Sequence, residues 1–421
     1  MGSLGGHMSH LWEDLDLTFG DINEIFYQAC TGNLGATEKF DGINVHFRVD
    51  PAGDLRFSTN GKQRESGGLS QAQFAKLMEG HPAEQTFVDG SEALFRLTKE
   101  SFWPFGFSGR NWINCDLINK HRAMTIDYDE CAIVFHGVRN FFGDSPGNIV
   151  ESFNKYARDC SSFSVVVNSN EWRICPPVKV HLEDIRGDGV LSNFEESINA
   201  LMRASGCSRN STLKEFAKAT LENGVINNLR ISTEKKNQLL AHILGEGTTS
   251  LVKIKKGLPA GLASRVSEIG KSVNRNKVIG QAMLPVELVV TYTGARILEN
   301  LDSELIEDSS REKDRLRNAV QAAIMLVETC SDDFEAIRTN LVEKYVSKFE
   351  KCGQITSPLE GIVFNYGLED STYKLTGNFA PINHILGIPR YGRGKIPPVV
   401  DGESINEIVE EIDLIKSMTT F

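Results

Sequence analysis

Residues 35–47 read GATEKFDGINVHF, in which a Lys-x-Asp-Gly element leads directly into an alternating apolar run. Such alternation with β-branched and aromatic side chains is typical of a half-buried strand. A second run of this kind, DLRFST at 54–59, follows after a Pro-Ala-Gly-Asp connection, which predicts a β-hairpin. We therefore expect Lys39 just before, or at the start of, the first strand of an antiparallel hairpin.

The composition indicates a globular protein. The chain has 421 residues, of which 40% are hydrophobic, enough for one large elaborated domain or two domains. Residues 1–8, MGSLGGHM, are typical of an expression-tag remnant. No membrane-length apolar run or secretory signal is visible, so we expect a soluble cytoplasmic protein without a membrane partner. The eight scattered cysteines form no Cys-x-x-Cys pair and predict reduced thiols rather than a zinc site.

The charge is unevenly distributed along the chain. The formal net charge is −11, yet residues 201–280 contain 14 Lys and Arg against 5 Glu and no Asp. This stretch is therefore about +9 and the remainder about −20. A basic stretch in an acidic chain favours a nucleic-acid-binding surface; the alternative is the solvated faces of ordinary helices.

The order of elements predicts an α+β fold. Residues 9–190 read as strands with short helices, whereas 191–352 show helical periodicity, with several helices opening on Ser or Thr. Strands return in 353–421, at GIVFNYG and STYKLTG. Because strand-rich segments bracket the helical block, we expect 191–352 to be an insertion or second lobe.

Five segments occur in an order that matches a known family. The chain resembles the covalent nucleotidyltransferase superfamily, which comprises the ATP-dependent RNA and DNA ligases and the mRNA-capping enzymes. EKFDG is similar to the nucleophile motif, CAIVFHG to the third, LEGIVF to the fourth and YKLTG to the fifth, while NCDLI resembles the segment before the third. The stretches HLWEDLDLTFGD and YKLTGNFAPINHILG also resemble ligase-like proteins of large tailed phages.

The resemblance implies an antiparallel-sheet nucleotidyltransferase domain, similar to ATP-grasp folds, that acts as an ATP-dependent RNA ligase. Lys39 would form a lysyl-AMP with ATP, and Lys374 would neutralise the α-phosphate. Glu360, with Asp116, would hold Mg²⁺ or Mn²⁺, since carboxylates suit hard cations. A neighbouring cation or metal is expected to lower the pKa of Lys39 so that its amine can attack.

The resemblance also implies the remaining pocket residues. Asp116 would contact the ribose or the metal, and one basic side chain after the first hairpin would bind phosphate; Lys62 and Arg64 are both candidates. Phe135 would stack on adenine, or be an ordinary core residue. Further residues are expected to line the pocket or to let the backbone approach the nucleotide: Glu38, Asp41, Gly42 and Gly361.

Three departures from the family pattern stand out. Thr376 replaces the second lysine that the fifth motif commonly has, Asp116 stands where glutamate is usual, and about 220 residues separate the third and fourth motifs. The GDSPG segment at 143–147 fits a serine-hydrolase pattern, but Pro146 lacks the N–H that an oxyanion hole needs. The hydrolase reading is therefore rejected.

The expected partner is nucleic acid. Only 44 residues follow Gly377, too few for the OB domain of DNA ligases, which favours RNA over DNA. The basic helical block and the PRYGRGK loop at 389–395 are the expected contacts, although that loop also fits a plain connector. The alternatives are a DNA ligase, a nucleotidyltransferase with another acceptor, and a non-catalytic nucleic-acid-binding relative.

Overall fold

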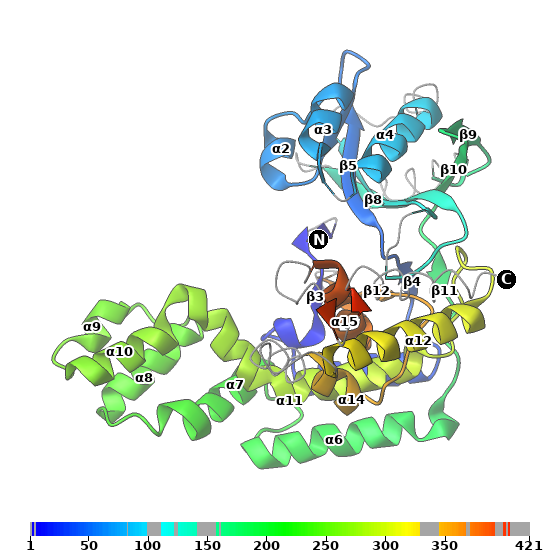
Figure 1. The fold of residues 1–421 in the computed structure, drawn as a ribbon. Helices are drawn as coiled ribbons and strands as arrows, with labels where there is room; N and C mark the ends of the chain where they lie inside the picture. The colour runs from blue at the N-terminus through cyan, green and yellow to red at the C-terminus, as the bar shows by residue number, and fades with distance from the viewer. Residues whose placement is uncertain are drawn as a thin grey trace.

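The protein has the α+β fold that the sequence predicts, and its two large β-sheets are separate (Figure 1). The structure, a computed structural model, describes residues 2–3, 6–81, 83–98, 111–121, 125–140, 157–159, 161–328, 345–367, 371–391, 399–400 and 403–404. The larger sheet has six strands in the order β6-β5-β7-β8-β10-β9, and the second has five in the order β11-β4-β12-β13-β3.

The six-stranded sheet contains the predicted hairpin. Its strands are β5 (Ile43–Val49), β6 (Leu55–Ser58), β7 (Asn111–Ile118), β8 (Cys131–Asn140), β9 (Ser164–Val167) and β10 (Asn170–Cys175). β5 and β6 pair antiparallel, with Phe47 opposite Phe57. These two rings and the odd-numbered apolar residues of β7 belong to one core, which α3 (Gln71–Met78) and α4 (Glu84–Thr98) cover. On the other face, β5 and β7 carry polar side chains, among them Asn44 and Asp116, and Ile118, Ala132 and Val134 join another apolar core.

The five-stranded sheet joins three distant parts of the chain. Its strands are β3 (Ser9–His10), β4 (Ala36–Lys39), β11 (Lys179–Val180), β12 (Gly361–Tyr366) and β13 (Ser371–Leu375). β4 pairs antiparallel with β12, and β12 pairs antiparallel with β13. The segments that resemble the nucleophile, fourth and fifth motifs are thus adjacent strands.

Local sequence signals explain where several helices begin. Thr18 and Thr212 form capping boxes at the starts of α1 (Phe19–Cys30) and α7 (Leu213–Leu221), and Ser232 caps α8 (Thr233–Ile243). The other long helices include α6 (Val190–Ser205), α10 (Ala260–Gly270), α11 (Ser272–Leu298), α12 (Ser309–Glu328) and α15 (Phe379–Tyr391), and the short ones α9 (Leu251–Lys255) and α14 (Ser347–Lys351).

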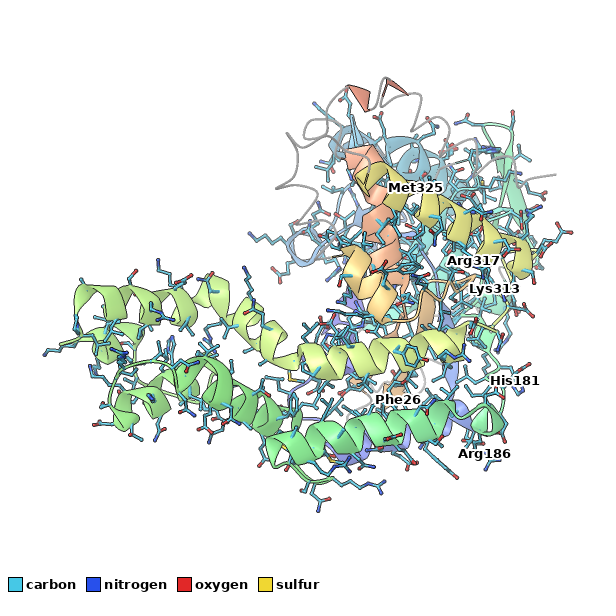
Figure 2. The ribbon with its side chains drawn as sticks, turned by 60° about the horizontal axis from the view of Figure 1, so that its bottom comes forward. Phe26, His181, Arg186, Lys313, Arg317 and Met325 are labelled. Carbon is cyan, nitrogen blue, oxygen red and sulfur yellow. The ribbon has the colours of Figure 1, made fainter. Side chains whose placement is uncertain are left out.

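The predicted helical block divides into three sets of helices. α6, α7 and α11 share a core with α1 and with apolar residues of β12 and β13, and α6 lies along α11 (Figure 2). α12 and α14 share another core with Phe40, Ile118, Tyr128 and α15. α8, α9 and α10, whose buried residues extend the first of these cores, project from the body beyond α7 and the start of α11, and we call these three helices the arm (Figure 1).

One helix in the described part of the chain is long and apolar enough to span a membrane by length and composition alone. It is Asn274–Leu298 of α11, and 44% of its apolar window is buried inside the protein. Met283, Val286, Val290 and Leu298 pack in the same core as α1. This burial is typical of a core helix in a soluble globular protein.

Candidate active site

Strand pairing brings Lys39 and Glu360 together. Lys39 is the last residue of β4 and lies opposite Gly361, so that Glu360 stands beside it at the entry to β12. Lys39 Nζ is 2.5 Å from Glu360 Oε1, and both side chains are 5% exposed. The sheet therefore holds a buried ammonium–carboxylate pair built from two distant segments.

The surroundings of Lys39 raise its pKa. Burial on its own would lower that pKa, but the negative charges of Glu360, Asp116 and Asp41 together raise it by more. Lys39 is consequently an ammonium in this structure. The expectation that a neighbouring cation lowers its pKa does not hold for the protein without its substrate, because the closest charged groups are carboxylates.

Asp116 faces the same site from the six-stranded sheet. It lies opposite Asn44 of β5, whose Nδ2 donates to Asp116 Oδ1 at 3.0 Å and to Asn114 Oδ1 at 2.8 Å. His136 Nε2 is 3.0 Å from Asp116 Oδ2. The Coulombic pull of His136 and Lys39 lowers the Asp116 pKa, although burial opposes them. Asp116 is therefore a buried anion beside Lys39.

Sequence reasoning missed Asn44, Asn114 and His136. The signal for the two asparagines was the alternation of β5 and β7, in which the even-numbered positions 44, 46, 114 and 116 are polar. His136 is the extra residue of a β-bulge, because Cys115 pairs with Phe135 while Asn114 pairs with Gly137. Sequence alone does not predict that bulge.

Lys374 lies on the same face of the five-stranded sheet as Lys39. It pairs with Val363, which pairs with Thr37, two residues before Lys39. Burial and the positive charge of Lys39 lower the pKa of Lys374. Thr376 is two residues further along this face and is buried. The site thus presents two lysines to whatever binds there.

Two glycines allow the close approach of the backbones. A Cβ on Gly42 would lie 2.6 Å from the Asp116 Cβ, and a Cβ on Gly361 would lie 2.2 Å from the Leu375 carbonyl oxygen. No side chain fits at either position without moving its neighbours. Gly42 therefore lets the nucleophile segment pack against β7, and Gly361 lets β12 pack against β13.

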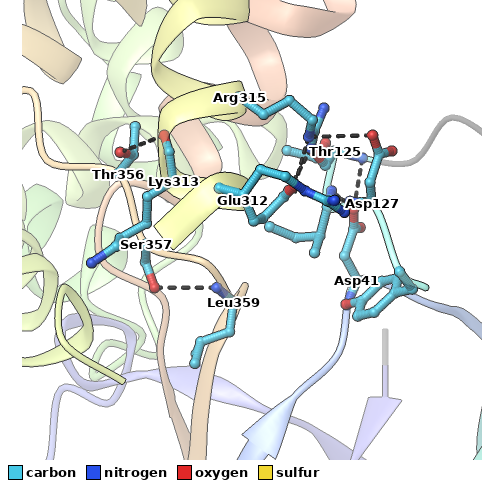
Figure 3. A network of polar contacts seen from close by, with 12 residues as sticks. Asp41, Thr125, Asp127, Glu312, Lys313, Arg315, Thr356, Ser357 and Leu359 are labelled. Carbon is cyan, nitrogen blue, oxygen red and sulfur yellow. Dashed lines mark hydrogen bonds and ion pairs between the residues drawn. The ribbon is translucent and has the colours of Figure 1, made fainter. Parts of the chain in front are cut away.

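Asp41 is held away from solvent by a loop of the protein itself. Its Oδ2 accepts from the backbone N–H groups of Thr125 at 2.8 Å and Ile126 at 3.1 Å, and its own N–H donates to Tyr128 Oη at 2.7 Å. Figure 3 shows this contact and the α12 residues behind the loop. Asp41 has a positioning role here rather than an open position in the pocket.

Glu38 and Phe135 do not line the site as expected. Neighbouring residues of a strand point to opposite faces, so Glu38 turns away from Lys39 and accepts from Ser303 Oγ at 2.7 Å. Phe135 is fully buried in the core of the six-stranded sheet, with its ring centroid 5.6 Å from that of Phe47. The β8 side chain that faces the site is instead His136.

The two candidates for the basic phosphate contact differ in position. Both lie on α2 (Gly61–Glu65), but Lys62 is exposed, whereas Arg64 Nη1 is 3.3 Å from His46 Nδ1. His46 lies on the polar face of β5, two residues beyond Asn44. Arg64 is therefore the one that reaches the polar face. Most of the 389–395 loop and all of the 143–147 segment lie outside the described residues.

The carboxylates suit a divalent cation that arrives with a phosphate ligand. Among the described residues, no group of three His, Cys, Asp or Glu side chains could hold a metal ion. Glu360 Oε2 is buried and has no hydrogen-bond partner, whereas Asp116 is engaged by Asn44 and His136. Mg²⁺ is commonly bound by one or two carboxylates together with substrate phosphates. Glu360 and Asp116 are the two carboxylates of the site that could supply such a ligand.

Comparison with protein-family models, with curated proteins and with solved structures finds no match to this chain.

Proposed function

We propose that this protein is an ATP-dependent polynucleotide ligase of the covalent nucleotidyltransferase superfamily, with RNA rather than DNA as its acceptor. The observation that carries the proposal is the buried Lys39–Glu360 pair, with Nζ 2.5 Å from Oε1, flanked by Asp116 and Lys374. A lysine nucleophile, a carboxylate and a second cation converge from three segments whose order along the chain is that of the superfamily.

The geometry supports the first step of ligation, which is the formation of lysyl-AMP on Lys39. Lys39 passes a proton to Glu360 Oε1 and attacks the α-phosphorus of ATP as a neutral amine. A nitrogen–phosphorus bond forms, the bond from the α-phosphorus to the bridging oxygen breaks, and pyrophosphate leaves. Lys374 offsets the negative charge that gathers on the α-phosphate. Mg²⁺ that arrives with ATP, held by Asp116 while Glu360 takes the proton, would supply further charge neutralisation on the phosphates.

The later steps follow from the chemistry of a phosphoramidate. The AMP group moves from Lys39 to the 5′-phosphate of an acceptor strand, which frees the lysine and leaves a 5′–5′ phosphoanhydride. A 3′-hydroxyl then attacks the activated phosphate, a phosphodiester forms and AMP leaves. The same basic face that neutralised ATP would serve these steps, because each of them develops charge on a phosphate.

The arm supplies a surface for the nucleic acid. Lys235 Nζ donates to the carbonyl oxygens of Ile254 at 2.8 Å and Lys256 at 2.5 Å, so this lysine stabilises the arm itself. Lys253 and Lys256 are exposed. Exposed lysines on a projecting helical unit support contacts to the phosphate backbone, which depend on charge and not on base sequence.

Incubation with ATP and Mg²⁺ tests the proposal. Wild-type protein should retain label from α-labelled ATP after denaturation and none from γ-labelled ATP, because pyrophosphate leaves. Lys39→Ala should retain no label, and Lys76→Ala, which removes an exposed lysine on α3, should label like the wild type. A wild type without label, or an undiminished Lys39→Ala, would contradict the proposal.

Acceptor strands separate the proposal from its alternatives. The adenylylated protein is given nicked duplex DNA, single-stranded RNA and split RNA hairpins, each with a 5′-phosphate and a 3′-hydroxyl. Joining of RNA supports the proposal, and joining of DNA alone identifies a DNA ligase. The buried Thr376 at the position of the usual second lysine is the feature that favours a non-catalytic relative. Such a protein would bind nucleic acid and take no label.

A further inference from the structure

The Lys-x-Asp-Gly element is connected to α12 by a chain of buried polar contacts (Figure 3). Arg315 and Glu312 lie one turn apart on α12, with side chains that are each 4% exposed. Arg315 Nε donates to Glu312 Oε2 at 2.6 Å, and Arg315 Nη2 donates to the Thr125 carbonyl oxygen at 2.7 Å. The backbone N–H groups of Thr125 and Ile126 in turn hold Asp41, two residues beyond Lys39.

Glu312 and Arg315 both bind the loop 125–127. Glu312 Oε1 accepts from the Asp127 backbone N–H at 3.2 Å, and Arg315 Nε is 3.2 Å from Asp127 Oδ2. A guanidinium with its fixed fork of donors can hold a carboxylate and a carbonyl oxygen at once. Because neither partner of the pair is exposed, the loop has little freedom to shift relative to α12.

Apolar packing reinforces the polar link. Phe40, between Lys39 and Asp41, belongs to the same core as Leu316, Ala319 and Val320 of α12. The helix therefore shares a core with Phe40 and is linked to Asp41 through the 125–127 loop. α12 comes from the part of the chain that the sequence indicates as an insertion, so it is not an obvious part of the site.

We infer that α12 is the positioning element of the nucleophile, and that Arg315, paired with Glu312, is a positioning residue that fixes Lys39 through the 125–127 loop and Asp41. The inference rests on the proposed function in one respect, that Lys39 is the group to be positioned. Arg315 does not touch the reacting atoms. Its loss should therefore lower the rate of the chemical step and leave the affinity for ATP largely unchanged.

The matched control lies on the same helix. Arg317 and Asp314 have the same three-residue spacing, with Nη1 to Oδ1 at 2.7 Å, but their side chains are 53% and 65% exposed (Figure 2). Arg317→Met removes an arginine from α12 without touching the loop. The test variant is Arg315→Met combined with Glu312→Leu, because replacing both partners of a buried pair by apolar residues leaves no unpaired charge. Arg315→Lys is the conservative variant.

Two readouts are measured on the full-length chain. The first is the rate constant for formation of the labelled lysyl adduct at saturating ATP, called kcat here, together with the ATP concentration that gives half of that rate, called KM. The second is hydrogen exchange at the Thr125 and Ile126 amides. The double variant should have kcat at least about tenfold lower, KM within about twofold, and exchange at least about tenfold faster. Arg315→Lys should fall between the double variant and the wild type, and Arg317→Met should match the wild type in both readouts.

Each outcome decides the inference. A folded double variant with wild-type kcat, or one whose exchange at these two amides is unchanged, would overturn it, as would a loss confined to KM. If the double variant does not fold, Arg315→Lys is judged by the same two criteria. If the wild type takes no label, the proposed function fails separately, and hydrogen exchange alone then decides whether α12 holds the loop.

Discussion

Lys39 and Glu360 share a buried site in which a proton can pass between them. Burial raises the pKa of the Glu360 carboxyl to about 7, well above that of an exposed glutamate. In the reactive form, one proton can move between the two groups. It is on the Lys39 ammonium before the transfer and on the Glu360 carboxyl after it. At low pH a second proton occupies Glu360, which then cannot accept the proton of Lys39.

The pH dependence of lysyl-AMP formation follows from this shared proton. With Mg²⁺ held constant and Glu360 free of metal, the kcat/KM of the wild type should rise about tenfold per pH unit below about 7 and level off above it. Glu360→Gln has no proton acceptor, so its much lower rate should keep rising towards alkaline pH. Rates are measured by incorporation of labelled AMP between pH 5.5 and pH 9. A wild-type rate that does not change with pH in this range would contradict the role of Glu360.

Glu38 provides a stability test at a residue outside the site. Burial raises its pKa to about 7, and its Oε2 has no hydrogen-bond partner. A carboxyl whose pKa is raised by folding stabilises the protein below pH 4.5, and this contribution is lost as the pH rises through about 7. Glu38→Gln should therefore raise the free energy of unfolding at pH 8 by at most about 3 kcal/mol.

Urea denaturation of Glu38→Gln and of the wild type checks this prediction. The difference between the two proteins should be larger at pH 8 than at pH 5, because the wild-type carboxyl is neutral at the lower pH. Equal pH dependence of the two proteins would show that Glu38 is not held as a buried carboxylic acid.

At the scale of elements, two strand contacts that bring the site together have no room for a side chain. Gly42 is the residue at which the nucleophile segment meets β7, and an added Cβ would lie 2.6 Å from Asp116 and 2.9 Å from Ile118. Gly35, just before β4, has no heavy atom within 4 Å of such a Cβ and has no unusual backbone conformation, so it offers a matched control.

Gly42→Ala should separate Lys39 from Asp116 and destabilise the fold by about 1–3 kcal/mol, as overpacking commonly does. Formation of the lysyl adduct should fall at least about tenfold, because small displacements at a reacting centre are costly. Gly35→Ala should match the wild type in thermal melting and in labelling. Wild-type behaviour of Gly42→Ala in both measurements would contradict the close packing of this segment on β7.

The elements also show where sequence reasoning reached its limit. The hairpin followed from a local pattern, whereas the proximity of Lys39, Glu360 and Lys374 was expected only from the resemblance to the nucleotidyltransferase motifs. The position of His136 depends on one extra residue in β8, and the role of Arg315 depends on a contact across 190 residues of sequence. Alternation along a strand does predict that Glu38 points away from Lys39, and that Phe135 lies on the opposite face of the sheet from His136.

At the scale of the whole molecule, the body is proposed to form lysyl-AMP and the arm to bind RNA. The body contains the Lys39 site and its supporting helices, whereas the arm projects with exposed lysines (Figure 1). In the described parts of 191–352, residues 191–328 and 345–352, periodicity predicted helices correctly, but it could not show which of them pack around the site. That distinction depends on long-range packing, for example of α12 on Phe40.

Charge reversal in the arm tests this division. Lys253→Glu combined with Lys256→Glu should weaken RNA binding and reduce the slope of log K against log salt by about 1.4, at roughly 0.7 per lost phosphate contact on a single strand. Labelling of Lys39 by ATP should persist. Lys76→Glu is the control on the body. Fluorescence anisotropy with a labelled RNA gives the slopes, and an unchanged slope in the double variant would exclude the arm as the binding surface.

The most direct measurement is the position of AMP on the protein. Wild-type protein is incubated with ATP and Mg²⁺, digested under conditions that preserve phosphoramidates, and its peptides are analysed by fragment mass spectrometry. AMP is expected on Lys39 alone, with loss of the adduct when pyrophosphate is added back. AMP on another residue, or none on any peptide, would contradict Lys39 as the nucleophile.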